Sequence, residues 1–163
     1  MSTTDLSQYD PSAVPNGEGK KVTIIVSEWN SDITFALRDG AIETLLRHGV
    51  KESDITVRYV PGSFELIYAT KKCLHYSGAD AIIILGSIIR GETPHFDYIS
   101  ESVMTNVGLL NATSSHTPHG VFVPVINGVL TTDNHKQAAD RAGGVLGNKG
   151  VEAAVTALKM IRF

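Results

Sequence analysis

The chain has 163 residues, which suffices for one domain with a hydrophobic core and leaves little room for a second. Hydrophobic residues make up 42% and charged residues 19%, a balance typical of a soluble globular protein. The net charge of −3 disfavours a general nucleic-acid binder, and the single cysteine, Cys73, excludes a disulfide within the chain.

The first twenty residues differ in character from the rest. They are polar, they contain Pro11, Pro15, Gly17 and Gly19, and they lack the basic-then-apolar pattern of a secretory signal. No apolar run reaches the ~18–20 residues that a transmembrane helix needs. We therefore expect a cytoplasmic protein without membrane contact, in which residues 1–20 form an extended arm, flexible or docked on a neighbouring subunit.

Strand and helix patterns alternate along residues 21–163, which we expect to form one domain. Short Val- and Ile-rich runs predict buried strands, and apolar residues at helical spacing predict helices that end at glycines such as Gly49 and Gly78. This alternation predicts an α/β fold with a parallel sheet that helices cover on both faces. Strands are expected at 22–27, 55–60, 81–89 and 121–130, and helices at about 31–48, 63–76, 96–112, 133–142 and 151–161, with caps at Ser31 or Asp32 and at Asp133.

Each predicted strand ends in polar or aromatic residues, and in a parallel sheet such ends meet at one edge, where ligands bind. The first strand leads into Ser27–Asn30, the second into Pro61–Glu65, the third into Arg90–His95 and the fourth into Asn127–Thr132. Aromatic rings for stacking, with amides and carboxylates to orient a bound molecule, predict a pocket for a planar polar ligand.

Three features of this edge indicate chemistry. His95 follows the turn after the third strand and is the first candidate for proton transfer, because imidazole titrates near neutral pH. Backbone N–H groups around Gly91–Thr93 and Gly62–Phe64 can bind an anion such as phosphate. Arg141 can add a bidentate contact, but it must reach the edge from a helix or from a neighbouring subunit.

Ordinary structural roles stay open for the same residues. Trp29 can be a packing residue, Glu65 a partner of a lysine, His95 a hydrogen-bonded loop histidine and Arg141 a solvated ion-pair partner, and Cys73 is expected in the core. The histidines show no metal-ligand spacing, so we expect no metal site. No GxGxxG or GxxxxGK[ST] loop supports nucleotide binding.

Four segments, in this order, resemble the 6,7-dimethyl-8-ribityllumazine synthase family of riboflavin biosynthesis. They are SEWN (27–30), VPGSFEL (60–66), LGSIIRGETPHFDY (85–98) and PVINGVLTTDNHKQAADRAG (124–143), followed by GNKG (147–150). The resemblance implies a flavodoxin-like, three-layer α/β sandwich with a four-stranded parallel sheet. It also implies an N-terminal arm that pairs with the next subunit.

The family joins 5-amino-6-(D-ribitylamino)uracil to 3,4-dihydroxy-2-butanone 4-phosphate, giving the lumazine, phosphate and water. The resemblance therefore implies a transferase that takes two small-molecule substrates and needs no cofactor or metal. It implies His95 as the proton shuttle. It assigns Trp29, Asn30, Ser63, Phe64, Glu65, Ser87, Ile88, Ile89 and Asn127 to the ring and ribityl chain of the pyrimidine substrate, and Glu92, Thr93, Arg141 and Lys149 to the phosphate.

The resemblance also implies a homopentamer with active sites between neighbouring subunits. The short kink 141–150 favours a hollow icosahedral shell of sixty subunits, and a shell of this kind could enclose riboflavin synthase. The long segment 111–120 predicts an enlarged surface loop that could oppose shell formation. Asn127 replaces an often aromatic or bulky family residue, and Val145 replaces a frequent lysine.

Three other functions remain open on the sequence. The protein can be a flavin-binding module without catalysis, in which Trp29 holds riboflavin or FMN. It can be a scaffold whose assembly matters more than its site. It can also be a flavodoxin-like phosphosugar enzyme with another substrate.

Overall fold

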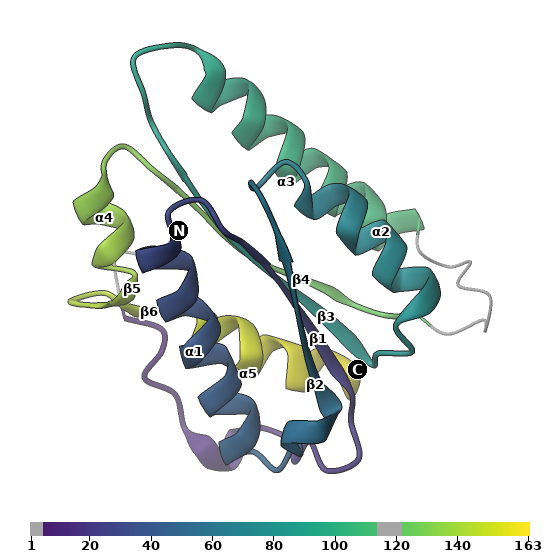
Figure 1. The fold of residues 1–163 in the computed structure, drawn as a ribbon. Helices are drawn as coiled ribbons and strands as arrows, with labels where there is room; N and C mark the ends of the chain where they lie inside the picture. Colours follow the sequence, from purple (N-terminus) through teal and green to yellow (C-terminus); the bar gives the residue numbers. More distant parts are fainter. Residues whose placement is uncertain (1–4, 114–121) are drawn as a thin grey trace.

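The computed structural model describes residues 5–113 and 122–163, whose main feature is a sheet of four parallel strands (Figure 1). The strands are β1 (Val22–Ser27), β2 (Ile55–Val60), β3 (Ala81–Ile89) and β4 (Val125–Thr132). They lie in the order β2-β1-β3-β4, which is the flavodoxin-like order, and each pairs in parallel with its neighbour. The predicted four-stranded parallel sheet is therefore confirmed.

Helices cover both faces of this sheet, so the predicted three-layer sandwich is confirmed as well. The helices are α1 (Ser31–Arg47), α2 (Leu66–Tyr76), α3 (His95–Thr113), α4 (His135–Ala139) and α5 (Lys149–Ile161), with short 3-10 helices η1 (Pro11–Ala13) and η2 (Glu52–Asp54). Alternate residues of the central strands enter different cores: Ile24 and Ile83 pack with α1 and α5, and Ile25 and Ile84 pack with α2 and α3. Because both faces are buried, these strands read as continuous apolar runs.

Several predicted element ends are wrong, among them the start of the second helix, which begins at Leu66 rather than at 63. Ser31 and Asp32 lie inside α1, whose N-cap is Asn30 in the left-handed region (φ 58°), without a capping bond from its side chain. The fourth strand runs over Val125–Thr132 rather than 121–130, directly after Pro124, which has no N–H for a sheet ladder. Residue 121 and most of the predicted enlarged loop lie outside the described residues.

The segment between α4 and α5 also differs from the prediction. Asn134, and not Asp133, caps α4 through its side chain, and the helix ends at Ala139 rather than Ala142. The chain then forms a small antiparallel hairpin of β5 (Ala142–Gly144) and β6 (Gly147–Asn148). Val145 lies exposed at the tip of this hairpin.

The N-terminal segment contacts its own domain. Val14 is buried in the core beside α1 and α5, and the Gly17 N–H donates to the His48 carbonyl at 2.8 Å. The Tyr9 hydroxyl lies 3.0 Å from His48 Nε2. Docking of this segment on a neighbouring subunit stays a prediction.

His48 makes stability depend on pH. Burial of the imidazole, together with the charge of Arg47, lowers the pKa of His48 from its ordinary value. The unfolded chain then binds a proton more readily than the folded one, so the free energy of unfolding falls as pH drops below ~6.5. We expect thermal unfolding of His48→Gln, which keeps a hydrogen-bonding side chain beside Tyr9, to depend less on pH between about 6.5 and 5. Equal pH dependence in both proteins would contradict this assignment.

Candidate functional site

A cavity of about 450 Å³ lies at the carboxyl ends of β1, β2 and β3 and at the start of α3. This is the edge of the sheet at which the sequence predicts a pocket. Ten of the predicted site residues line it: Trp29, Asn30, Ser63, Phe64, Glu65, Ser87, Ile88, Ile89, Thr93 and His95.

Trp29 forms the aromatic wall of the cavity. The chains that follow β1 and β2 stay paired beyond the strands, because the Trp29 N–H donates to the Pro61 carbonyl at 3.0 Å. The indole side chain is 66% exposed although it lines the cavity. A ring held by its backbone and largely open to solvent can stack on a planar ligand.

Asn30 connects two strand ends. Its left-handed backbone conformation is one that asparagine tolerates, and its Nδ2 donates to the Ser87 carbonyl of β3 at 3.0 Å. This leaves the Asn30 side-chain oxygen as an acceptor. The Ser87 hydroxyl is buried and has no partner in the part of the chain that the structure describes.

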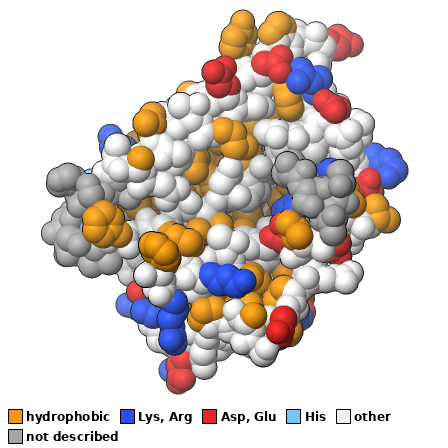
Figure 2. All heavy atoms as spheres, turned by 180° about the vertical axis from the view of Figure 1, so that it is seen from behind, with side chains coloured by type: hydrophobic (Ala, Val, Ile, Leu, Met, Phe, Trp, Pro, Cys, Tyr) orange, Lys and Arg blue, Asp and Glu red, His pale blue; other side chains and the backbone are white. Residues whose placement is uncertain are grey.

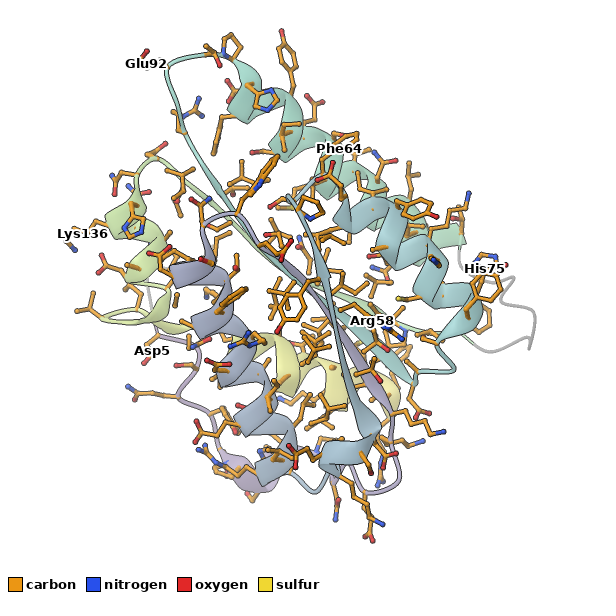
Figure 3. The ribbon with its side chains drawn as sticks, viewed as in Figure 1. Asp5, Arg58, Phe64, His75, Glu92 and Lys136 are labelled. Atoms are coloured by element: carbon orange, nitrogen blue, oxygen red, sulfur yellow. The ribbon has the colours of Figure 1, made fainter. Side chains whose placement is uncertain are left out.

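Glu65 is oriented by backbone rather than by a lysine. Its Oε2 accepts from the Gly62 N–H at 3.0 Å, and among the described residues it forms no ion pair, so the proposed lysine partnership is not observed. Ser63 is buried beside it, and Phe64 is 48% exposed. Figure 3 shows Phe64 at the beginning of α2, on the side of the molecule where α3 also begins.

Arg90 holds the turn that carries His95. Its guanidinium donates to both carboxylate oxygens of Asp97, at 3.0 and 3.2 Å, and to Asp133 at 3.4 Å, and it lies 4.1 Å from the centre of the Phe96 ring. These hydrogen bonds, above all those to Asp97, raise the pKa of Arg90. The two residues that follow His95 are therefore fixed from outside the cavity.

His95 itself is the first residue of α3 and is exposed at the cavity. It makes no hydrogen bond or ion pair with any described residue, so its ring nitrogens are open to a ligand. Glu92 does not line the cavity; Figure 3 shows it at the outer tip of the loop between β3 and α3.

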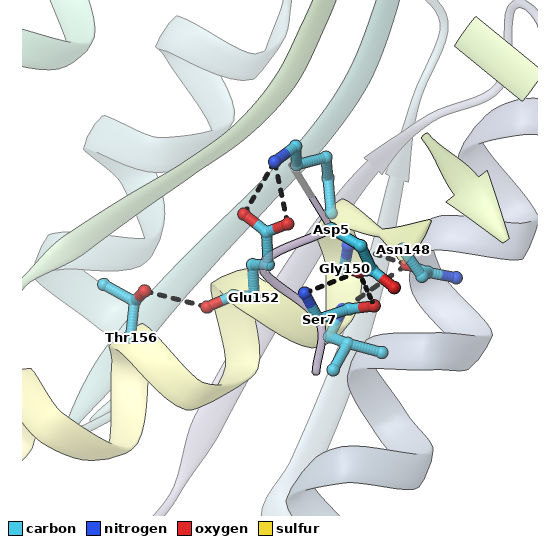
Figure 4. A network of polar contacts seen from close by, with 8 residues as sticks. Asp5, Ser7, Asn148, Gly150, Glu152 and Thr156 are labelled. Atoms are coloured by element: carbon cyan, nitrogen blue, oxygen red, sulfur yellow. Dashed lines mark hydrogen bonds and ion pairs between the residues drawn. The ribbon is translucent and has the colours of Figure 1, made fainter. Parts of the chain in front are cut away.

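A second hollow, of about 520 Å³, lies along β4 and contains Asn127 and Lys149. The Asn127 amide contacts Met104 Sδ at 2.9 Å and accepts from the Val129 N–H at 3.0 Å. Lys149 is 9% exposed, and its Nζ lies 2.7 Å from each Glu152 carboxylate oxygen (Figure 4). Asn127 and Lys149 thus line the same hollow, whereas His95 lines the first cavity.

Arg141 lines neither hollow. Its Nη1 donates to the Gln137 carbonyl at 2.9 Å, whereas its Nε is buried without a partner among the described residues. Its carbonyl accepts from the Lys149 N–H at 2.9 Å, which links it to the start of α5. The predicted phosphate residues are therefore divided within one chain: Thr93 lies at the first cavity, and Lys149 lies at the second.

The edge strand β4 is open on its outer side, since within the described residues it pairs only with β3. Figure 2 shows the molecule from behind, where hydrophobic side chains gather across the middle of the face and most charged side chains lie at its margins.

Sequence reasoning missed two features around these hollows. The Arg90 contacts join residues from β3, α3 and the end of β4, and no local pattern signals them. The β5–β6 hairpin places Asn148 as the N-cap of α5, where its side chain accepts from the Gly150 N–H at 2.8 Å. The Asn148–Gly150 pattern is the signal that could have started the helix at Lys149 rather than Val151.

The described residues contain neither a cluster of metal ligands nor a membrane-spanning helix. No three metal-ligating side chains come together in residues 5–113 and 122–163. Within the same ranges, no helix has the length and apolar character needed to cross a bilayer.

Comparison with known proteins shows extensive similarity. The family model for 6,7-dimethyl-8-ribityllumazine synthase matches residues 19–163. Proteins of that name from Bacteroides fragilis and Porphyromonas gingivalis are 53% and 51% identical to this chain, covering 88% and 96% of it and 95% and 92% of their own lengths. The protein of that name from Phocaeicola vulgatus is 46% identical, covering 98% of this chain and 90% of its own length.

Proposed function

The chain belongs to the 6,7-dimethyl-8-ribityllumazine synthase family, and we propose that it makes the lumazine from 5-amino-6-(D-ribitylamino)uracil and 3,4-dihydroxy-2-butanone 4-phosphate. The observation that carries this proposal is the cavity in which an exposed indole, an oriented carboxylate and an imidazole without a partner among the described residues lie together. The reaction class is that of a transferase, with phosphate and water released.

The proposed chemistry needs proton transfers more than it needs a strong nucleophile. The substrate amine attacks the ketone, and water leaves to give an imine. Phosphate is eliminated, which leaves a carbonyl next to the imine after a proton shift. The ribitylamino nitrogen then attacks this carbonyl, and a second water leaves as the ring closes. His95 can take and return protons in these steps because it lines the cavity and its ring nitrogens have no partner in residues 5–113 and 122–163. Holding two substrates in one cavity supplies much of the remaining acceleration.

The cavity walls suggest a role for each group. Trp29 stacks on the pyrimidine ring, and the Asn30 oxygen with the Ser63–Glu65 segment holds the ribityl hydroxyls. Ser87, Ile88 and Ile89 meet the ring edge.

The divided phosphate residues support a site shared between copies of this chain. We propose that Arg141, Lys149 and Asn127 of one subunit complete the cavity of the next, with Glu92 and Thr93, in a homopentamer. In a ring of identical head-to-tail contacts, each subunit can contribute residues to the cavity of its neighbour. Docking of the N-terminal arm on a neighbour belongs to the same proposal. Assembly into sixty-subunit shells, enclosure of riboflavin synthase and a cytoplasmic location stay predictions.

The test is a turnover assay. Purified protein is mixed with both substrates, and the fluorescent lumazine is followed against the uncatalysed rate, with each substrate omitted in turn as the control. We expect product formation above background that needs both substrates. A folded protein without acceleration would contradict the proposal, and tight riboflavin or FMN binding in that protein would identify a flavin-binding module instead.

A further inference from the structure

Gly62 lies directly against the indole of Trp29. A Cβ atom at position 62 would stand 2.6 Å from two carbons of the six-membered ring and 3.0 Å from Glu65 Oε2. Real Cβ atoms essentially never approach other atoms to 2.6 Å, so a side chain at position 62 displaces the ring. Gly62 is not among the glycines with positive φ, so the missing side chain matters for space and not for backbone conformation.

The backbone around this contact has little freedom to adjust. The Glu28 N–H donates to the Val60 carbonyl at 2.8 Å, and the Trp29 N–H donates to the Pro61 carbonyl at 3.0 Å. These two bonds fix the distance between the segments that carry Trp29 and Gly62. A methyl group at position 62 is therefore accommodated by the indole, which is 66% exposed and can rotate into solvent.

Gly62 also orients the carboxylate of Glu65. The Gly62 N–H donates to Glu65 Oε2, so one backbone position touches both the aromatic wall and the acidic group of the cavity. Both groups lie on the cavity side of the β2–α2 turn.

We propose that Gly62 is a positioning residue: it lets the Trp29 ring lie flat against the turn and, through its N–H, aims the Glu65 carboxylate at the same ligand. The part of this inference that concerns substrate rests on the proposed function. The part that concerns the placement of the ring rests on the contact alone, and the two parts are tested by different measurements.

Intrinsic fluorescence tests the placement without any substrate. Trp29 is the single tryptophan of the chain, so all tryptophan emission comes from this ring. We expect Gly62→Ala to increase quenching by acrylamide, because the ring face now covered by Gly62 becomes accessible. The matched control is Gly108→Ala in α3, where no described atom beyond the adjacent residues and the helix's own backbone lies within 4 Å of the added Cβ, and its quenching should equal that of the wild type. Unchanged quenching in Gly62→Ala would overturn the inference.

Kinetics test the consequence for substrate. Displacing a stacking ring should raise the KM for the ribitylaminouracil about tenfold, equivalent to about 1.4 kcal/mol, with a smaller change in kcat. A merely destabilised fold would instead reduce the active fraction, lowering kcat and leaving KM unchanged.

A double-mutant cycle on thermal stability keeps the test decisive if Gly62→Ala folds too poorly for kinetics, because the smaller ring of Trp29→Phe should relieve part of the lost stability. Where Gly62→Ala can be assayed, the same cycle applies to KM. Against a Trp29→Phe background the smaller ring leaves room at position 62, so Gly62→Ala should raise KM less than it does in the wild type. Equal effects in the two backgrounds would overturn the inference. If the wild type makes no lumazine, the proposed function fails. The quenching experiment still decides whether Gly62 sets the position of the Trp29 ring.

Discussion

Replacing His95 by alanine should lower kcat for lumazine formation by about 10²–10⁴-fold without abolishing it, the range typical of a lost general acid–base group. His95 lies at the cavity and has no hydrogen bond to any described residue, so it is free to exchange protons with a substrate. Binding of both substrates in one cavity does not depend on the imidazole and continues to accelerate the reaction.

The measurement is steady-state kinetics with His75→Ala as the matched control. His75 is an exposed histidine at the far end of α2, away from the cavity, and its Nδ1 lies 2.9 Å from the Lys71 carbonyl of its own helix, so its loss should leave kcat unchanged (Figure 3). An unchanged kcat in His95→Ala would remove His95 from the reaction. Complete loss of turnover in a folded His95→Ala protein would show that the imidazole does more than shuttle protons.

Replacing Arg141 by alanine should raise the KM for the butanone phosphate by roughly ten- to a hundredfold, because a hydrogen bond to a charged group contributes about 1.5–3 kcal/mol. The structure favours an anion at this side chain, since Arg141 Nε is buried without a partner among the described residues. The effect should fall on KM more than on kcat, because the phosphate is bound before it leaves.

Two variants sharpen this measurement. Arg141→Lys keeps the charge and loses the planar fork, so its KM should lie between those of the wild type and Arg141→Ala. Arg47→Ala is the control, because Arg47 forms an exposed ion pair with Glu43 and lines neither hollow, so its loss should leave KM unchanged. An unchanged KM in Arg141→Ala would show that this arginine does not bind the phosphate.

The sheet and the main cavity could be predicted from the sequence because their signals are local. A run such as Ala81–Ile89 is apolar throughout, and this is what burial on both faces requires. Residues after the first three strands then meet at one edge as a consequence of parallel pairing. This is why seven predicted residues from these strand ends line one cavity, whereas Ser87, Ile88 and Ile89, inside β3, come from the family resemblance.

Features that depend on distant contacts could not be predicted. The end of α4 is set by the pairing of Ala142 with Asn148, and the Asn148 side chain also donates to the Ala36 carbonyl at 3.0 Å. The Arg90–Asp133 contact joins residues that are 43 positions apart. The approach of Trp29 to Gly62 depends on the spacing of two strands, which composition does not encode.

The sequence indicates that Arg141 must reach the strand ends from a helix or from a neighbouring subunit, but it does not indicate which hollow each of the other residues lines. His95 and Lys149 line different hollows of one chain. We propose a site made by two copies of the chain because it brings these residues together.

Co-expression of His95→Ala and Arg141→Ala subunits tests that claim most directly. The two variants carry different tags, and assemblies that contain both are purified through both tags and assayed for lumazine formation. If each site takes His95 from one subunit and Arg141 from the next, random mixing in a ring restores about a quarter of the sites, and activity rises well above that of either variant alone. Activity no higher than the average of the two variants would show that both residues serve the same chain, and would contradict a shared site.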